Sequence, residues 1–285
     1  MTDNAGAWVP SARQVERDRY RRRRTRRRGL VAAASTVVVL GVLVIAVVSA
    51  PGWDRVQQTY FDPAMARESV GPVAEAFVTN VELFLIAEVM ILALALVVAV
   101  IRVAPVPALM PLKILATVYT DVLRGTPTIL VILLVGFGLP ALQLQGVPES
   151  RFVLGLIALT LSYGAYVAEV LRAGILSVHP TQWASGRSLG LSYATTLRLV
   201  VLPQAVRRVA PPLLNDFVSL QKDTALVSAI GLVEALRAAQ VITQRNFNFT
   251  PYVVAAVFFI VATIPLARLT DWLSLRAARR DSGAA

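Results

Sequence analysis

Charged side chains stand inside stretches of this sequence that are otherwise apolar. Glu88 lies in the apolar segment 81–101, and Lys222 and Asp223 lie in segment 211–236. An ionisable group inside a membrane span is costly, and it usually faces a watery path or another polar group. These residues could line the path of a polar solute or carry protons or sodium ions. They could equally join helices by hydrogen bonds inside a bundle.

Other residues in the second stretch support the same two interpretations. In a helix, Gln221 and Thr224 share one stripe with Ser228, whereas Lys222 and Asp223 fall on the adjacent stripe. Because Lys222 and Asp223 are sequence neighbours, they do not face each other on a helix. We therefore expect each of them to meet a group on another helix.

The residues that most enzymes need are scarce. The chain has no cysteine and a single histidine, His179, which excludes disulfides and thiolate ligands and disfavours a Ser-His-Asp triad. A G-x-x-x-x-G-K-[ST] phosphate loop is also absent, since the glycines after Gly186 are not followed by lysine. If transport by this chain uses ATP, the nucleotide must therefore be bound by another protein.

Composition indicates a membrane protein. Of 285 residues, 56% are hydrophobic, and the mean hydropathy is +0.65. The net charge of +11 is concentrated in the N-terminal tail, which contains the arginine run 21–28, and in loops beside apolar segments. That distribution follows the positive-inside rule and predicts a disordered basic tail near anionic lipid. It gives no indication of a nucleic-acid partner.

Apolar runs predict an all-α membrane protein with six transmembrane helices and both termini in the cytoplasm. The first run ends in a small-residue sequence like a signal-peptide cleavage site, but it is longer than a signal core and is followed by Pro51, so we expect it to be retained. Outside the spans we expect, among other segments, a basic cytoplasmic tail at 1–29, an extracytoplasmic loop at 51–80 and a cytoplasmic tail at 273–285. The predicted spans cover residues 30–50, 81–101, 114–142, 152–171, 211–236 and 251–269.

Two short sequences near the cytoplasmic ends of spans could form a hinge. Asp121 and Arg124 share a helix face and could pair, and the following Gly125, Thr126 and Pro127 favour a break in the helix. On the next span, Tyr166 and Glu169 are three residues apart and also share a face.

The segment 181–203 is too polar to cross a bilayer, although long apolar segments flank it. Thr181 can cap a helix that begins at Gln182, and Gly190 suits the left-handed position that ends it. Ser192 can cap a second helix, which Pro203 would end. The segment therefore predicts a helix–turn–helix on the cytoplasmic face.

This loop resembles the "EAA" loop of permease subunits of bacterial ATP-binding-cassette importers. Ala184-Ser185-Gly186 stands at the position of the triplet, whose glutamate is missing here, while Gly190 and Leu202-Pro203 keep their spacing. The sequence around Arg124-Gly125-Thr126-Pro127 is similar to the FRGTP signature of the polar-amino-acid subgroup. The segment that contains Tyr166 and Glu169, and the Lys222-Asp223-Thr224 motif, also resemble that subgroup. The resemblance covers about residues 70–276.

The resemblance implies a type I importer permease, with five core helices in residues 81–272 and a coupling loop at 175–207. It implies two ATPase subunits that bind ATP and magnesium, a second identical or homologous permease, and an extracytoplasmic solute-binding protein, but no cofactor on this chain. The location would be the bacterial cytoplasmic membrane, and the substrate a polar amino acid, with glutamate or glutamine preferred. Implied coupling residues are Gln182, Trp183, Ala184, Ser185, Gly186, Gly190, Leu202 and Pro203.

Residues of the translocation path or its gate follow from the same resemblance. They are Arg124, Gly125, Thr126, Pro127, Tyr166, Glu169, Gln221, Lys222, Asp223 and Thr224. The alternative is an ion-coupled secondary transporter of small polar solutes, in which Glu88, Lys222 and Asp223 would serve the ions. Such transporters usually contain internal repeats, and the sequence shows none.

Overall fold

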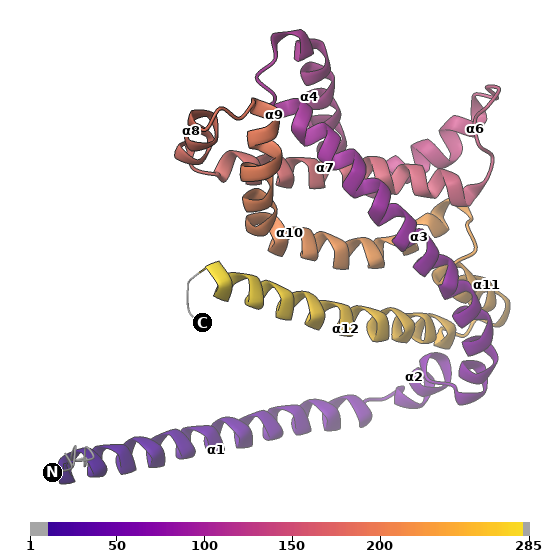
Figure 1. Ribbon diagram of the computed structural model, residues 1–285. Helices are drawn as coiled ribbons and strands as arrows, with labels where there is room; N and C mark the ends of the chain where they lie inside the picture. The colour runs from indigo at the N-terminus through magenta and orange to yellow at the C-terminus, as the bar shows by residue number, and fades with distance from the viewer. Residues whose placement is uncertain (1–10, 282–285) are drawn as a thin grey trace. The chain divides into compact units, whose positions relative to one another are not determined.

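A computed structural model describes residues 11–281, and every regular element in that range is a helix (Figure 1). The first ten residues of the predicted basic tail and the last four of the predicted C-terminal tail lie outside the described residues. The chain divides into two compact units, residues 1–58 and 59–285. The longer helices are α1 (Ala12–Val48), α3 (Pro63–Val103), α4 (Met110–Gly125), α7 (Arg151–Ser177), α10 (Leu202–Asp223), α11 (Ala235–Asn246) and α12 (Thr250–Asp281).

The first unit consists mainly of α1, which is one unbroken helix of 37 residues. The prediction of a disordered tail is wrong for residues 12–29, because α1 continues from the basic sequence into the apolar one. Arginine is a good helix former, and no proline interrupts the sequence between Ala12 and Val48. The part Arg24–Val48 is long and apolar enough to cross a membrane.

The predicted extracytoplasmic loop at 51–80 is also helical, which corrects the sequence interpretation. It forms the short helix α2 (Trp53–Tyr60) and the first part of α3. Asp62 caps α3, since its side chain accepts hydrogen bonds from the backbone of Ala64 and Met65 at 2.8 and 3.4 Å. The charged residues Arg67, Glu68 and Glu75 lie on the exposed side of α3. Its opposite side buries a helical stripe that includes Ser69, Val73, Ala76 and Asn80.

Two predicted spans are bent. Residues 107–125 and 128–141 meet at 109°, where α4 gives way to α5 (Thr128–Leu133), a π-helical turn (Leu134–Gly138) and α6 (Leu139–Ala141). Residues 193–230 and 235–246 meet at 49°, after a 3-10 helix (Thr224–Ile230). The predicted loop at 238–250 is therefore mostly α11. By length and composition, the described residues contain four membrane-spanning candidates, or up to six if each bent pair is one span.

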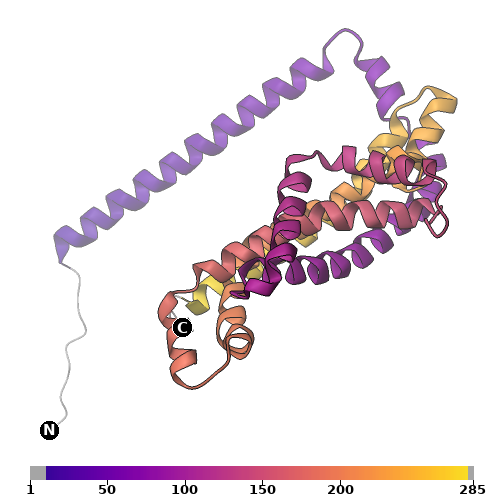
Figure 2. The ribbon, with the colours of Figure 1, turned by 90° about the horizontal axis from the view of Figure 1, so that it is seen from above.

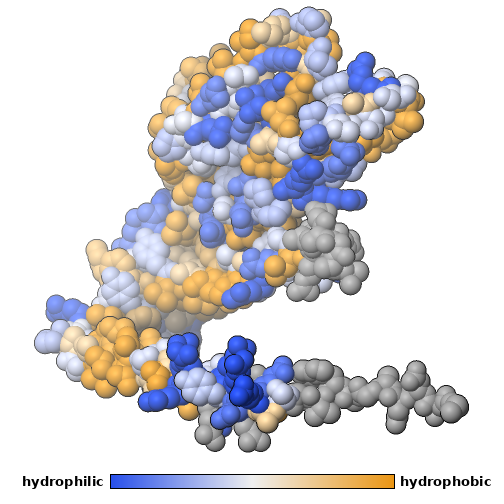
Figure 3. Space-filling view, turned by 90° about the vertical axis from the view of Figure 1, so that its left-hand side faces the viewer, coloured by the Kyte–Doolittle hydropathy of each residue, from blue (hydrophilic) through white to orange (hydrophobic). Residues whose placement is uncertain are grey.

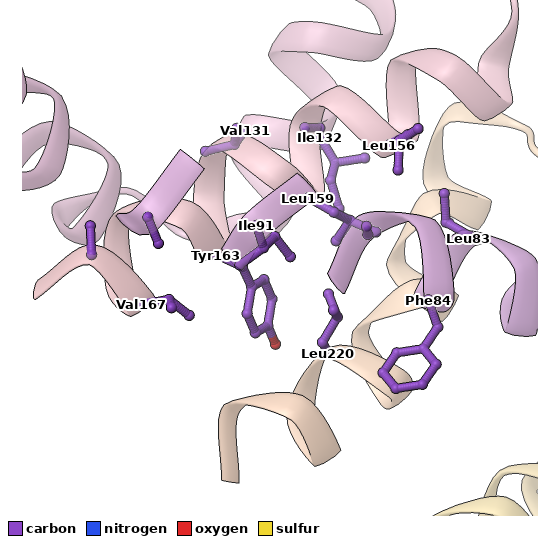
Figure 4. Packing of buried hydrophobic residues seen from close by; sticks show 14 of the residues in the cluster. Leu83, Phe84, Ile91, Val131, Ile132, Leu156, Leu159, Tyr163, Val167 and Leu220 are labelled. Atoms are coloured by element: carbon purple, nitrogen blue, oxygen red, sulfur yellow. The ribbon is translucent and has the colours of Figure 1, made fainter. Parts of the chain in front are cut away.

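The core of the second unit surrounds α7. It packs against α3, α4, α5 and α10, and α12 packs against α3 and α10 (Figure 2). Buried side chains from these helices meet in one apolar cluster, in which Leu159 and Tyr163 of α7 lie near Ile91 and Leu220 (Figure 4). Apolar side chains also cover much of the outer surface, as expected for helices that face lipid (Figure 3).

Close packing of α7 depends on glycine. A Cβ atom on Gly174 would lie 2.4 Å from Cγ1 of Val209 on α10, and one on Gly155 would lie 2.4 Å from Cγ1 of Val227. Real Cβ atoms do not approach carbon so closely, so the two neighbouring segments contact α7 only because these positions lack side chains. Small residues commonly allow such close helix contacts in membranes.

We expect Gly174→Ala to destabilise the protein by about 1–3 kcal/mol, because the added methyl group forces α7 and α10 apart. The matched control is Gly71→Ala on α3, where a Cβ atom would meet nothing within 4 Å. That substitution should leave stability unchanged or raise it by about 0.5–1 kcal/mol. Thermal unfolding of both variants in one detergent measures the difference, and equal midpoints would contradict the close-packing argument.

Candidate functional site

The predicted helix–turn–helix begins at α8 (Pro180–Ser188). The cap residue is His179 rather than Thr181, which corrects the sequence interpretation. Nδ1 of His179 accepts a hydrogen bond from the backbone N–H of Thr181 at 3.3 Å and lies 2.8 Å from the Thr181 hydroxyl. The helix starts earlier than expected because Pro180 suits the first turn, where its missing N–H group has no helical partner to lose.

The turn after α8 has the predicted form. Gly190 adopts a left-handed conformation with φ of 78°, and its N–H donates to the carbonyl of Arg187 at 2.9 Å. Leu191 N–H donates to the carbonyl of Gly186 at 3.2 Å, which closes the end of α8. Ser192 caps α9 (Tyr193–Thr196) by accepting from the Thr195 N–H at 3.2 Å. The predictions for Gly190 and Ser192 are therefore confirmed.

Two contacts hold the helices of this hairpin together, and a hydrogen bond attaches it to the end of the bundle. The rings of Trp183 and Tyr193 stack with centroids 4.9 Å apart, and the Tyr193 hydroxyl donates to the Val103 carbonyl of α3 at 3.2 Å. Gly186 lies so close to Thr196 that a Cβ atom would be 2.6 Å from its Cγ2. The outer side of α8 remains uncovered, with Gln182, Ala184 and Ser185 exposed.

The end of α8 is apolar and uncovered, since Leu189 is 81% exposed. The hairpin thus presents a short helix beyond the bundle, attached through the half-buried rings of Trp183 and Tyr193. Such a surface suits contact with another protein, because hydrophobic side chains at an interface lose contact with water on binding.

Pro203 does not end the second helix, contrary to expectation. The backbone passes from α9 through a π-helical turn (Leu197–Val201) directly into α10, and Pro203 lies in the first turn of α10. A wider turn just before a proline accommodates its ring and its missing N–H group. Leu202 packs against the small apolar cluster that joins the hairpin to α3 and α7.

The second candidate group surrounds the break between α4 and α5. Gly125 ends α4, Thr126 and Pro127 lie in the break, and Tyr166 of α7 donates its hydroxyl hydrogen to the Arg124 carbonyl at 3.0 Å. The predicted break is confirmed. The predicted ion pair of Asp121 with Arg124 is wrong, because the described ion pair of Arg124 is with Glu169, at 4.0 Å.

Glu169 is the centre of this second group. Its carboxylate contacts Arg102 of α3 at 2.5 Å and Arg172 of α7 at 2.5 Å, in addition to the longer contact with Arg124. Sequence reasoning placed Tyr166, Glu169 and Arg124 together but did not find Arg102. The partner of Arg102 lies 67 residues away in the sequence, beyond the reach of local patterns.

The third candidate group consists of the last three residues of α10 and the first residue of the following 3-10 helix, and its members have different surroundings. Gln221 accepts a hydrogen bond from Thr263 of α12 at 2.7 Å, and Asp223 accepts one from Tyr163 of α7 at 2.7 Å. Lys222 is exposed, and no hydrogen bond or ion pair of its side chain occurs among residues 11–281. The expectation that Asp223 contacts another helix is confirmed, whereas Lys222 has no such contact within the described part of this chain.

Thr224, the fourth of these residues, belongs to a buried network that sequence reasoning missed. Glu234, which is fully buried, caps α11 by accepting from the N–H groups of Leu236 and Arg237 at 3.0 and 2.8 Å. Asn80 of α3 donates to Glu234 at 3.0 Å and to the Thr224 hydroxyl at 3.1 Å, and accepts from the Ala235 N–H at 3.0 Å. An asparagine within a long apolar helix was the available signal, because such a group requires a partner.

A protein-family model described as "Binding-protein-dependent transport system inner membrane component" matches residues 108–279. The chain is 36% identical to the L-cystine transport system permease protein of Bacillus subtilis (strain 168), over 69% of this chain and 77% of that protein. It is 35% identical to the glutamine transport system permease protein of Escherichia coli (strain K12), over 56% of this chain and 74% of that protein. The corresponding values for the arginine transport system permease protein of Bacillus subtilis (strain 168) are 35%, 53% and 69%.

Two solved structures are similar in fold. A chain of a crystal structure titled as an amino acid ABC transporter with histidines has a TM-score of 0.64 and 31% identity, and the match covers 72% of this chain and 94% of that one. A chain of the MetNI methionine ABC transporter in an inward-facing conformation has a TM-score of 0.58, with coverage of 75% and 98%. Its identity of 15% supports the fold alone.

We expect Asn80→Ala to lower the free energy of unfolding by about 1–3 kcal/mol, because it leaves a buried carboxylate and a buried hydroxyl with fewer hydrogen bonds. The matched control is Asn215→Ala on α10, an exposed helical position. Thermal unfolding of purified protein in detergent measures both. A midpoint for Asn80→Ala equal to that of the control would contradict the structural role of the network.

Proposed function

The chain belongs to the family of inner-membrane components of binding-protein-dependent transport systems, and we propose that it is the permease subunit of an ATP-driven importer of polar amino acids. Two ATPase subunits would bind ATP and magnesium and hydrolyse ATP, while this chain, which binds no cofactor, would form the path. A second permease, identical or homologous, would complete the path across the bacterial cytoplasmic membrane.

The exposed helix α8 is the observation that carries this proposal. It is held on the end of the bundle by Trp183 and Tyr193, and its surface residues Gln182, Ala184, Ser185 and Leu189 are free to contact an ATPase. The absence of a phosphate-loop sequence agrees with hydrolysis on a separate subunit. Movement of the ATPases would then pull α8 and transmit force to the helices behind it.

Six spans with both termini in the cytoplasm agree best with the charge distribution. In this arrangement each bent helix pair forms one span, and α8 would face the cytoplasm. The turns at 142–150 and 247–249 would then face outward, where an extracytoplasmic solute-binding protein would deliver the substrate. Such a protein would determine much of the choice of amino acid.

The names of the relatives support an amino acid substrate. The three curated relatives described above carry cystine, glutamine and arginine in their names, and the more similar solved structure is titled as an amino acid transporter. Within the polar class, glutamine or glutamate remains our preferred substrate. The ion-coupled alternative has no support from the described residues or from these relatives.

We propose that the path runs beside α10 and the α4–α5 break. Lys222 supports this position, because an exposed lysine inside a span, without a partner among residues 11–281, must face water, a partner subunit or the solute. Asp223, Gln221 and Thr224 would act from the neighbouring stripe, and Arg124 with Gly125, Thr126 and Pro127 would form the moving gate with Tyr166 and Glu169.

Co-purification tests the proposed coupling role. The tagged chain should co-purify from its native membranes with an ATPase that contains a phosphate loop, and Gly190→Pro should lose most of that ATPase. The reason is geometric: proline fixes φ near −65°, whereas Gly190 has φ of 78° and donates a backbone hydrogen bond that proline lacks.

Gly146→Pro is the control for that substitution, since Gly146 also has a positive φ of 84° but lies in a different turn, which we place on the opposite face. It should retain the ATPase. Loss of the ATPase in both variants would indicate general misfolding, and retention in both would contradict the docking role of α8.

We expect Lys222→Ala to reduce uptake by vesicles about tenfold or more while the complex still assembles, because a charged hydrogen bond to the solute is worth roughly 1.5–3 kcal/mol. Lys113→Ala, which removes the chain's other lysine, in the first turn of α4, should transport normally. Uptake by Lys222→Ala at the level of this control would exclude Lys222 from the path.

A further inference from the structure

The Glu169 cluster joins three helices through one carboxylate, and its three ion pairs are unequal. Arg102 contacts Glu169 at 2.5 Å, and both side chains are largely buried, at 12% and 19% exposed. Arg124 lies at 4.0 Å and is 42% exposed. Removing one partner from a buried pair is strongly destabilising, whereas exposed pairs contribute little. The link from α7 to α3 is therefore strong, and the link from α7 to α4 is weak.

The lone pairs of the carboxylate explain why the weak pair is weak. Arg172, on the same helix as Glu169, donates from Nε to both oxygens and from Nη2 to Oε1, and Arg102 donates to Oε2. These contacts use most of the acceptor sites of one carboxylate. One negative charge faces three guanidinium groups, so Arg124 is attracted but has no well-formed hydrogen bond to Glu169.

The end of α4 has room to move. In its last turn, the polar contacts of α4 to α7 are the Arg124–Glu169 pair and the exposed hydrogen bond from Tyr166 to the Arg124 carbonyl. Leu123 packs against the apolar cluster, and the partly buried hydrogen bond from Tyr119 to the Leu161 carbonyl lies one turn earlier. A Cβ atom on Gly125 would meet nothing within 4 Å, and the helix axis turns by 109° just beyond it. In contrast, α3 and α7 form the most extensive helix pair of the second unit.

The buried Arg102–Glu169 pair also lies next to the candidate coupling loop. Tyr193 of the hairpin donates to the carbonyl of Val103, the residue that follows Arg102. Trp183 and Tyr193 pack against the same small cluster as Val100 and Val103. A force on α8 would therefore reach the end of α3 directly and, through Arg102, the carboxylate of Glu169.

We propose that Glu169 is a positioning residue with two roles: through Arg102 it keeps α3 and α7 together as one rigid body, and with Arg124 it forms a releasable latch that sets the position of the α4–α5 break. The latch is closed in the conformation described here. It opens when α4 moves against the α3–α7 pair during the transport cycle. The part of this inference that involves ATP rests on the proposed function. The unequal strength of the Arg102–Glu169 and Arg124–Glu169 pairs does not depend on that function.

Distances between spin labels test the contact of α7 with α3 and the contact of α7 with α4 separately. The chain has no cysteine, so labels can be attached at introduced cysteines on exposed positions: Val122 on α4, Val97 on α3 and Leu176 on α7. In the full chain in lipid nanodiscs, Arg124→Gln should broaden the Val122–Leu176 distance distribution and leave the Val97–Leu176 distribution unchanged. Arg172→Gln, which removes the same charge without linking two helices and frees acceptor sites of Glu169 for Arg124, should broaden neither distribution.

An unchanged Val122–Leu176 distribution in Arg124→Gln, or equal broadening in Arg172→Gln, would overturn the latch. This arm requires no ATPase, so it decides the inference even if the proposed function fails. Failure of an ATPase to co-purify would count against the proposed function alone.

The complex with its co-purified ATPase provides the functional readout. Between the nucleotide-free state and the state trapped with ATP and vanadate, the Val122–Leu176 distance should change and the Val97–Leu176 distance should not. Arg124→Gln should raise ATP hydrolysis in the absence of substrate several-fold, and Arg124→Lys, which keeps the charge, should restore most of the wild-type rate. A state-independent Val122–Leu176 distance, or wild-type hydrolysis by Arg124→Gln, would overturn the proposal.

Discussion

Burial of α7 is the constraint on which the rest of the structure depends. Of its most apolar 18-residue window, 61% is buried, against 33% for the window that includes α3 and 17% for α12. A helix with neighbours on so many sides needs small residues where backbones approach, and Gly155 and Gly174 supply them. The positions of α3, α4, α5 and α10 follow from their contacts with this one helix.

Polar groups in the bundle fall into two sets with different properties. Asn80, Thr224 and Glu234 form a fully buried network that joins α3, the 3-10 helix and α11. The Glu169 cluster is partly exposed and contains one long ion pair. Asn80 and Arg102 lie on the same helix, about 33 Å apart at 1.5 Å per residue. The middle of α3 is thus fixed by a satisfied network, whereas the cluster at its end combines the buried Arg102–Glu169 pair with a longer contact to Arg124 that can exchange.

The hairpin of α8 and α9 and the Glu169 cluster are joined through the last turn of α3. Val103 accepts a hydrogen bond from the hairpin, and Arg102 pairs with Glu169. A short exposed helix, an adjacent rigid helix pair and a loosely held break near it are the parts that a permease driven by an external ATPase requires. Bistable contacts of this kind allow small displacements to become larger helix movements.

Local sequence determined the features that depend on a few neighbouring residues. The left-handed turn at Gly190, the cap at Ser192 and the break after Gly125 follow from backbone preferences of glycine, serine and proline. Hydropathy identified the apolar segments, and motif spacing identified the family. These properties are encoded within short stretches, so no knowledge of distant contacts was necessary to find them.

Tertiary structure decided whatever depends on residues far apart in the chain. It gave Glu169 the partner Arg102 and separated Arg124 from Asp121, and it brought Asn80 against Glu234 across 154 positions. It also extended α3 back to Pro63 and carried α10 through Pro203, because buried apolar faces and a π-helical turn outweighed local helix-breaking signals. A charged side chain shows in sequence that it needs a partner, but only the packing of helices determines which one it meets.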